Sequence, residues 1–89
     1  MTTMFVRHTV SDYKTWRKAY DDFAPVQKAK GVTAQAVYRA ADNPNDITIT
    51  HEFATAEAAQ AFAKSTELKN AMQNAGVTGA PTIWFTNKS

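Results

Sequence analysis

The sequence contains no cysteine and little glycine or proline, with three of each of the latter two in 89 residues. Without thiols the chain has no disulfide, no thiolate nucleophile and no cysteine-ligated metal. Its glycines are too widely spaced for a phosphate-binding loop. Ser11, Ser65 and Ser89 have no convincing histidine and acid partners, so hydrolase chemistry is not expected.

The chain also lacks long apolar runs and a strong excess of one charge. Ten basic and eight acidic side chains are interspersed and give a formal net charge of +2. Nucleic-acid-binding proteins usually gather Lys and Arg on one face, so no nucleic-acid partner is expected. No stretch approaches the roughly 20 apolar residues of a membrane span, and residues 1–7 do not resemble a signal peptide. We therefore expect a cytoplasmic protein without a membrane partner.

The most informative stretch is residues 46–53, where apolar and polar side chains alternate. Ile47, Ile49, His51 and Phe53 share one face, and two threonines and a glutamate share the other. Alternation of this kind predicts a strand with one buried face. Residues 4–10 show the same pattern, with His8 on the apolar side.

The remaining patterns predict a single domain over residues 1–89 with the order strand, helix, strand, strand, helix, strand. Helix starts are expected at Ser11 or Asp12 and at Thr55, with breaks near Pro25 and Ser65. Further strands are expected at 32–40 and 82–86, with a loop at 77–81. Right-handed crossovers then favour a ferredoxin-like α+β fold, βαββαβ, with an antiparallel sheet ordered 4-1-3-2 and both helices on one face.

The other face of this sheet is expected to be polar and to need a cover. In residues 32–40, alternation places Tyr38 towards the helices and Gln35 and Arg39 on the open face. Arg7 is expected to pair with Glu52 there, or Arg39 with a carboxylate of the other subunit. The alternative is that these side chains bind an anion within the barrel. A second copy of the sheet is the simplest cover, which predicts a homodimer through this polar face.

The segment Val6-Arg7-His8-Thr9-Val10-Ser11-Asp12-Tyr13-Lys14-Thr15-Trp16 resembles the opening of small dimeric α/β-barrel proteins. These belong to the superfamily of the antibiotic biosynthesis monooxygenases, and some carry the label cyclase. The similarity extends over residues 37–39, 41–45, 52–53, 68–72 and 75–77, and Pro81. The resemblance implies a dimeric α+β barrel and, for an enzyme, cofactor-independent oxidation or rearrangement of a small aromatic or polyketide-like molecule. The superfamily also holds haem-degrading enzymes and isomerases, so no catalytic set is carried over.

His8 and His51 are the only histidines, and both fall on the helix-facing side of central strands. We expect them near one another, on a diagonal of the sheet, where they would act as acid, base or hydrogen-bond donor in a pocket. The alternative is two structural histidines at the edge of a small core. A metal site would need a third ligand, which is not evident, so no metal is expected. The resemblance in turn implies that no cofactor takes part.

Trp16, Tyr20 and Tyr38 are expected to line the same pocket and position a small hydrophobic or aromatic ligand. The alternative is an aromatic stripe that only fills the core. If the Tyr20 hydroxyl is buried it needs a partner, and His8 or His51 could supply one. Three functions remain open at this point: an enzyme with His51 and His8 as catalytic groups, a non-catalytic ligand-binding protein, and a purely structural dimer.

Overall fold

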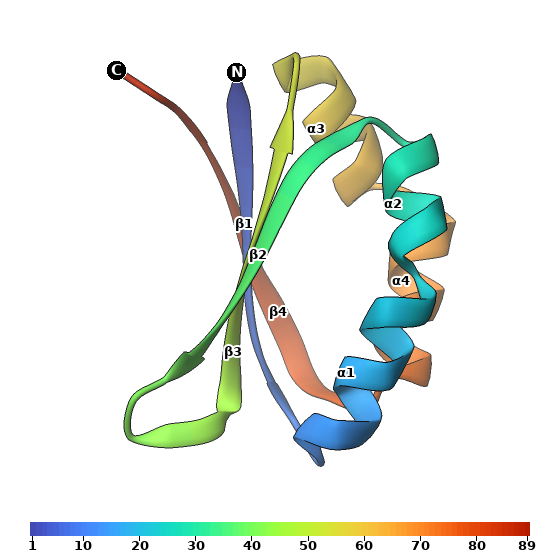
Figure 1. Ribbon diagram of the computed structural model, residues 1–89, viewed down its shortest axis with the longest axis vertical. Coiled ribbons are helices and arrows are strands. Elements are labelled where there is room, and N and C mark those ends of the chain that lie inside the picture. The colour runs from blue at the N-terminus through green and yellow to red at the C-terminus, as the bar shows by residue number, and fades with distance from the viewer.

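A computed structural model describes residues 1–89 as one sheet with all helices on one side (Figure 1). The elements are β1 (Thr2–Val10), α1 (Tyr13–Asp22), α2 (Ala24–Ala29), β2 (Val32–Ala40), β3 (Asn43–Phe53), α3 (Ala56–Ala63), α4 (Thr66–Asn74) and β4 (Val77–Asn87). The four strands are antiparallel in the order β2-β3-β1-β4. This confirms the ferredoxin-like fold and the predicted 4-1-3-2 order. None of the helices combines the length and apolar character that a membrane span requires.

Local signals fix the helix boundaries. The side chains of Asp12, Thr55 and Ser65 each accept a hydrogen bond from a backbone N–H three residues further on. Pro25 lies in the first turn of α2, where its missing N–H costs no helical hydrogen bond. Each predicted helical stretch therefore consists of two short helices, and the break in each lies where the sequence predicts it.

The last strand is longer than the sequence predicts. β4 begins at Val77, so the expected loop at 77–81 is wrong. Three residues of β4, Gly79–Pro81, stand opposite His8 alone, because the register shifts on either side of it. Gly79 has a φ of +73°. A bulge on an edge strand accommodates both glycine and proline, which explains why these residues had the appearance of a loop.

The helix-covered face of β1 and β3 holds the core, as the alternation predicts. One apolar cluster surrounds Phe53 and Phe62, and a second surrounds Trp16, Ile47 and Ile49. All five of these side chains are buried. Side chains from both clusters, together with His8, His51 and Gln27, line the site described below.

The prediction of which β2 side chains face the helices is wrong. Val32 pairs with Phe53 but Ala34 pairs with Glu52, so Thr33 is an extra residue in the strand. From Ala34 to Arg39 each side chain therefore points to the face opposite to the one expected. Gln35 and Arg39 therefore lie on the helix side, where the Arg39 guanidinium stacks 3.7 Å above the Tyr13 ring. Simple alternation counted from Val32 has no means of detecting one inserted residue.

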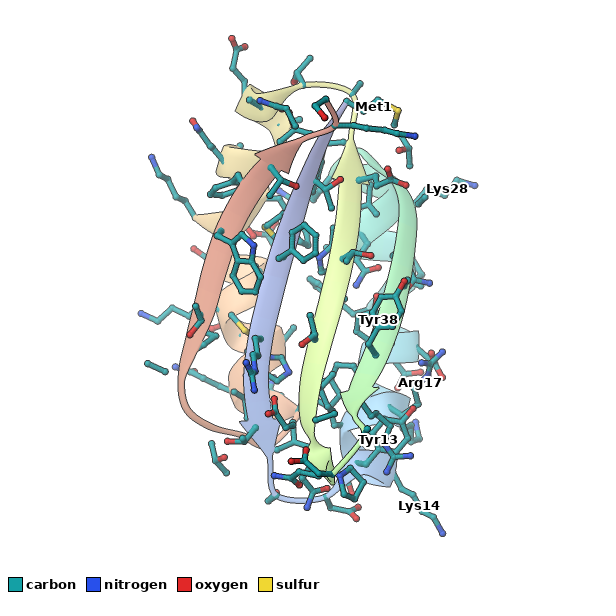
Figure 2. All side chains as sticks on the ribbon, turned by 90° about the vertical axis from the view of Figure 1, so that its left-hand side faces the viewer. Met1, Tyr13, Lys14, Arg17, Lys28 and Tyr38 are labelled. Carbon is teal, nitrogen blue, oxygen red and sulfur yellow. The ribbon has the colours of Figure 1, made fainter.

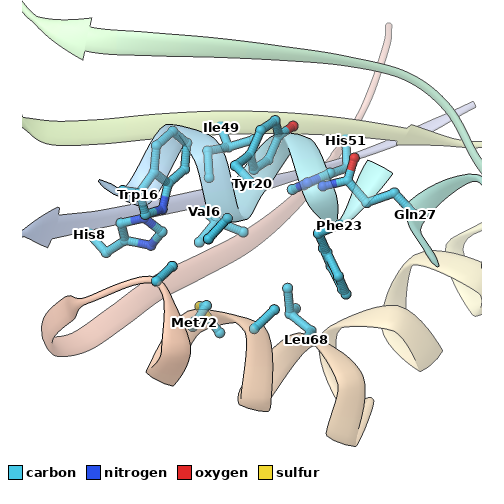
Figure 3. Close-up of a pocket in the computed structure, with 13 residues that line it drawn as sticks. Val6, His8, Trp16, Tyr20, Phe23, Gln27, Ile49, His51, Leu68 and Met72 are labelled. Carbon is cyan, nitrogen blue, oxygen red and sulfur yellow. The ribbon is translucent and has the colours of Figure 1, made fainter. Parts of the chain in front are cut away.

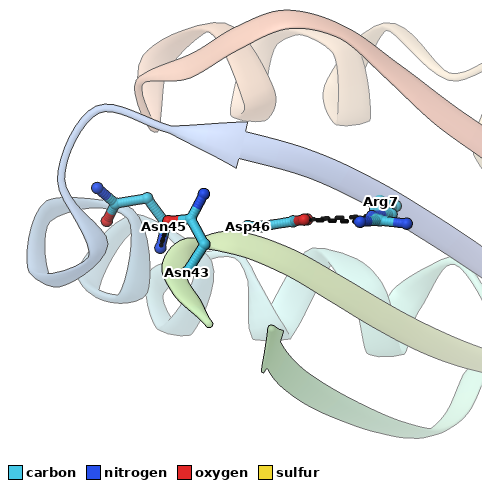
Figure 4. Close-up of polar contacts among 4 residues, drawn as sticks. All are labelled: Arg7, Asn43, Asn45 and Asp46. Atoms are coloured by element: carbon cyan, nitrogen blue, oxygen red, sulfur yellow. Dashed lines mark hydrogen bonds and ion pairs between the residues drawn. The ribbon is translucent and has the colours of Figure 1, made fainter. Parts of the chain in front are cut away.

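The open face of the sheet is bare in this single chain (Figure 2). Phe5 stacks on Trp84 with ring centroids 5.2 Å apart, and Trp84 is 39% exposed. The predicted pair of Arg7 with Glu52 is wrong. Arg7 instead makes two hydrogen bonds to the Asp46 carboxylate, at 2.7 and 3.1 Å (Figure 4). The reason is register, because Arg7 stands opposite Thr48 and far along the strand from Glu52.

Candidate functional site

A cavity of about 30 Å³ lies between the sheet and the helices (Figure 3). Its lining is mostly apolar and includes two histidines and one glutamine. The strands contribute Val6, His8, Ile49 and His51; α1 contributes Trp16, Ala19 and Tyr20; Phe23 follows α1; Gln27 comes from α2; Leu68, Ala71, Met72 and Ala75 belong to α4 or its end. A water molecule needs roughly 10–15 Å³ of such space, so the cavity as it stands has room for about two waters.

The two histidines lie at opposite ends of this cavity. His51 pairs with Met4 and His8 pairs with Ile47, so they are four residues apart along β1, or ~13 Å at ~3.3 Å per residue. The expectation that they are diagonal neighbours is therefore wrong. Alternation in the sequence determines which face a side chain occupies, but it does not determine the register between two strands.

Both imidazoles are buried without hydrogen-bond partners. His8 is 5% exposed and His51 is 1% exposed, and none of their four ring nitrogens has a partner in the protein. Buried polar atoms are nearly always satisfied, because leaving one unpaired costs about 1–3 kcal/mol. These four atoms are therefore the most unusual feature of the interior, and they are available to a molecule in the cavity.

Burial keeps both imidazoles neutral near pH 7. It lowers the pKa of His51 to about 4. Burial also lowers the pKa of His8, although the negative charge of Asp46 opposes that shift. A neutral imidazole carries one N–H donor and one bare nitrogen acceptor. Each end of the cavity thus offers one donor and one acceptor.

An aromatic wall joins the two histidines. The Trp16 ring stacks on Tyr20 with centroids 4.9 Å apart, and it meets the His8 ring edge-on at 5.8 Å. Tyr20 in turn lies 6.4 Å from the His51 ring. Four of the five residues proposed from the sequence therefore line one cavity. A flat apolar molecule could lie against this wall with a polar group at either end.

The Tyr20 hydroxyl does not bind a histidine, contrary to the expectation. It donates to the Gln35 side-chain oxygen at 2.6 Å, which the bulge in β2 makes possible by turning Gln35 towards the helices. Burial raises the pKa of Tyr20, and the Gln27 side chain partly offsets this shift. The phenol is thus a neutral donor that is already engaged, and it leaves the nitrogens of His51 unoccupied.

Tyr38 lies outside the cavity, so its predicted role in lining the pocket is wrong. It stands opposite Thr48 on the open face of the sheet and is 59% exposed (Figure 2). The Thr33 bulge is the physical cause, because it turned Tyr38 outward and Gln35 inward.

Gln27 is a cavity residue that the sequence reasoning did not identify. It is only 3% exposed and its amide reaches into the cavity from α2. Positions 16, 20, 23 and 27 follow a helical spacing of four, three and four residues. That spacing was a usable signal, but the proline at position 25 obscured it. Nowhere in the chain do three His, Asp or Glu side chains gather in an arrangement that could hold a metal ion.

Comparison with known proteins identifies a family. Residues 6–74 match the antibiotic biosynthesis monooxygenase family. No curated protein matches the sequence. The fold is similar to a solved structure from Bordetella bronchiseptica classed with these monooxygenases, at 14% identity over 99% of this chain and 96% of that one, with a TM-score of 0.82. A protein of the same class from Caulobacter crescentus is 17% identical over 99% of this chain and 89% of that one, with a TM-score of 0.78.

A third similar structure has a more specific description. It is SnoaB from Streptomyces nogalater, described as a cofactor-independent oxygenase, which is 13% identical over 99% of this chain and 94% of that one, with a TM-score of 0.75. At this level of identity the likeness establishes the fold, whereas function depends on the site itself.

Proposed function

The chain belongs to the antibiotic biosynthesis monooxygenase family, and on that premise we propose that it is a cofactor-independent oxygenase acting on a small aromatic or polyketide-like molecule. The observation that carries the proposal is the set of four unpartnered imidazole nitrogens facing an apolar, aromatic cavity. A substrate with an acidic hydroxyl or C–H group would satisfy them and would stack on Trp16 and Tyr20.

The chemistry requires only a base and an electron-rich substrate. His51 takes a proton from the substrate, and the resulting carbanion or enolate gives an electron to O₂. The two radicals combine into a peroxide anion, which takes the proton back from the imidazolium. Loss of water then converts the CH₂ group to a carbonyl. Overall R₂CH₂ and O₂ give R₂C=O and H₂O, and all the electrons come from the substrate.

The low pKa of His51 makes it a weak base in the empty cavity, because desolvation penalises the imidazolium. An anion within about 4–6 Å favours the charged form and raises the pKa of its neighbour. Proton transfer is therefore expected only as an ion pair with a bound substrate. In this arrangement His8 holds the far end of the molecule through a hydrogen bond.

The cavity must also widen, because about 30 Å³ is too small for an aromatic ring. The α4 wall includes the half-buried Met72, whose flexible side chain can change rotamer without moving the sheet. Widening is therefore assigned to the helix side, and His8 and His51 stay fixed on β1 and β3.

A homodimer through the open face is part of the proposal. The stacked Phe5 and Trp84 rings and the exposed Tyr38 lie on a sheet face that no helix covers. A second sheet would bury these rings and close an α+β barrel. The catalytic cavity lies on the other side of each sheet, so each protomer keeps its own.

The test measures O₂ uptake and product mass with a panel of anthrones, which carry an acidic CH₂ group between two aromatic rings. The substitution His51→Ala should lower turnover by roughly 10²–10⁴-fold, the usual contribution of a general base. Tyr38→Phe on the open face is the matched control and should leave turnover unchanged. If turnover is unaltered in His51→Ala, His51 is not the general base.

Two features favour a second candidate, a protein that binds a small hydrophobic ligand without changing it. No carboxylate lines the cavity, and burial lowers the pKa of both imidazoles, an effect that Asp46 only partly offsets at His8. A bound compound recovered unchanged after incubation in air would favour this candidate. If no compound binds, the purely structural dimer is the better description.

A further inference from the structure

A second hollow lies on the surface directly behind the cavity wall. This groove has a volume of about 530 Å³ and is bounded by the end of α3, by α4 and by the bulged part of β4. Met72 is the one residue that lines both the groove and the cavity. The half-buried Met72 side chain therefore borders both the cavity with the unpartnered histidines and an open surface depression.

The groove carries positive charge. Lys64 and Lys69 line it, and no acidic side chain does. The ion pairs of the protein involve other lysines, and the nearby Glu67 binds Lys30 at 2.9 Å. Lys64 and Lys69 are both exposed and are free to meet an anion from outside.

Met72 is suited to move out of the way. Its side chain is unbranched and has several rotatable bonds, so it changes shape at little cost. The opposite side of the groove is open at Gly79, where a Cβ atom would meet nothing within 4 Å. Rotation of Met72 towards this space would open the wall between the two hollows.

We propose that the groove is the entrance to the cavity and that its lysines bind the carboxylate of an aromatic acid. The ring displaces Met72 and enters the cavity towards His8 and His51, while the carboxylate stays between Lys64 and Lys69. This inference rests on the proposed function, and it adds a binding site and a substrate class, namely flat aromatic molecules with one anionic end.

The experiment compares 2-naphthoate with its neutral amide, 2-naphthamide, by NMR titration of the full-length protein. The Met72 methyl group reports on the entrance, and the His51 ring reports on the cavity. Both ligands should shift both signals, and naphthoate should bind at least tenfold more tightly. The double substitution Lys64→Gln and Lys69→Gln should abolish that difference and leave naphthamide binding unchanged. Lys14→Gln with Lys88→Gln, which removes the same charge elsewhere, should preserve it.

The second part of the experiment substitutes Met72, the side chain that lines both the groove and the cavity. Met72→Ala should speed the binding of both ligands several-fold, whereas the similarly sized Met72→Leu should change it little. Equal affinities for naphthoate and naphthamide, or unchanged binding rates in Met72→Ala, would contradict the proposal that the groove is the entrance to the cavity. A His51 shift in those same titrations would still support the cavity as the binding site. If neither ligand shifts His51, the proposed function and this inference both fail.

Discussion

The two faces of the sheet are built from alternate residues of the same strands, yet they differ in kind. The helix-covered face holds the buried aromatic and aliphatic core and, within it, two histidines without partners. The open face carries threonines, the Phe5–Trp84 stack and the Arg7–Asp46 pair, all of them at least partly accessible. The covered face supplies the stability of the single chain, and it also contains the polar atoms that favour a ligand. The open face is suited to a partner subunit.

The largest expected contrast lies in the core. Phe53→Ala should lower the free energy of unfolding by about 3–5 kcal/mol, because it leaves a cavity beside Phe62 in fully buried surroundings. Thr50→Ala, on the opposite face of the same strand, should cost less than about 1 kcal/mol. Urea unfolding of both variants measures the difference. Similar losses for the two substitutions would contradict the assignment of the faces.

The next contrast depends on pH. The folded pKa of His51 is about 4, below its unfolded value of about 6.5, so the unfolded chain binds a proton first as pH falls. Its contribution to stability is complete above pH 6.5 and is lost between pH 6.5 and 4, by roughly 3 kcal/mol. His8, whose pKa burial also lowers, should add to the loss in the same direction. Urea unfolding at pH 7 and pH 4.5 measures the loss, and the variant His51→Gln should show a clearly flatter profile.

The third contrast concerns dimer formation through the open face. Trp84→Lys should weaken the proposed dimer by about 2 kcal/mol or more, the usual cost of losing a central aromatic residue, which is at least a 30-fold change in the dissociation constant. Native mass spectrometry and sedimentation at several concentrations measure it. Lys88→Gln is the control, since it changes a charge beyond the end of β4. A wild-type protein that remains monomeric at high concentration would exclude this role for the face.

The smallest contrast tests the bulge at Thr33. Tyr38→Ala should change stability by no more than about 0.5 kcal/mol, because Tyr38 is largely exposed in the single chain. Gln35→Ala should cost about 1 kcal/mol or more, because it leaves the buried Tyr20 hydroxyl without its acceptor. Chemical unfolding at protein concentrations low enough to keep the chain monomeric distinguishes the two. If Tyr38→Ala costs more stability than Gln35→Ala, Tyr38 would face the helices and Gln35 the open face, as simple alternation predicts.

Most of the fold could be predicted from local signals. The caps at Asp12, Thr55 and Ser65 act within one turn of helix, and the alternation in β1 and β3 identifies their buried side directly. The order of elements then leaves few topologies open. For these reasons the sheet order and the positions of Trp16, Tyr20 and both histidines on the covered side agree with the structure.

The rest depends on contacts between distant residues. The register of β1 against β3 sets the distance between His8 and His51, and the sequence contains no local signal for it. The bulges at Thr33 and at Gly79–Pro81 insert residues that alternation counts as ordinary. The bulge at Thr33 alone turned Tyr38 away from the site and brought Gln35 to the Tyr20 hydroxyl.

The most direct test of the site is an NMR titration of the His51 ring nitrogens in the unliganded protein. An imidazole that is buried without partners should remain neutral at pH 7 and take up a proton only near pH 4. That result would establish an available donor and an available acceptor in the cavity. Protonation near the ordinary value of about 6.5 would mean that His51 is solvated or paired, and it would contradict the assignment of His51 as the buried base.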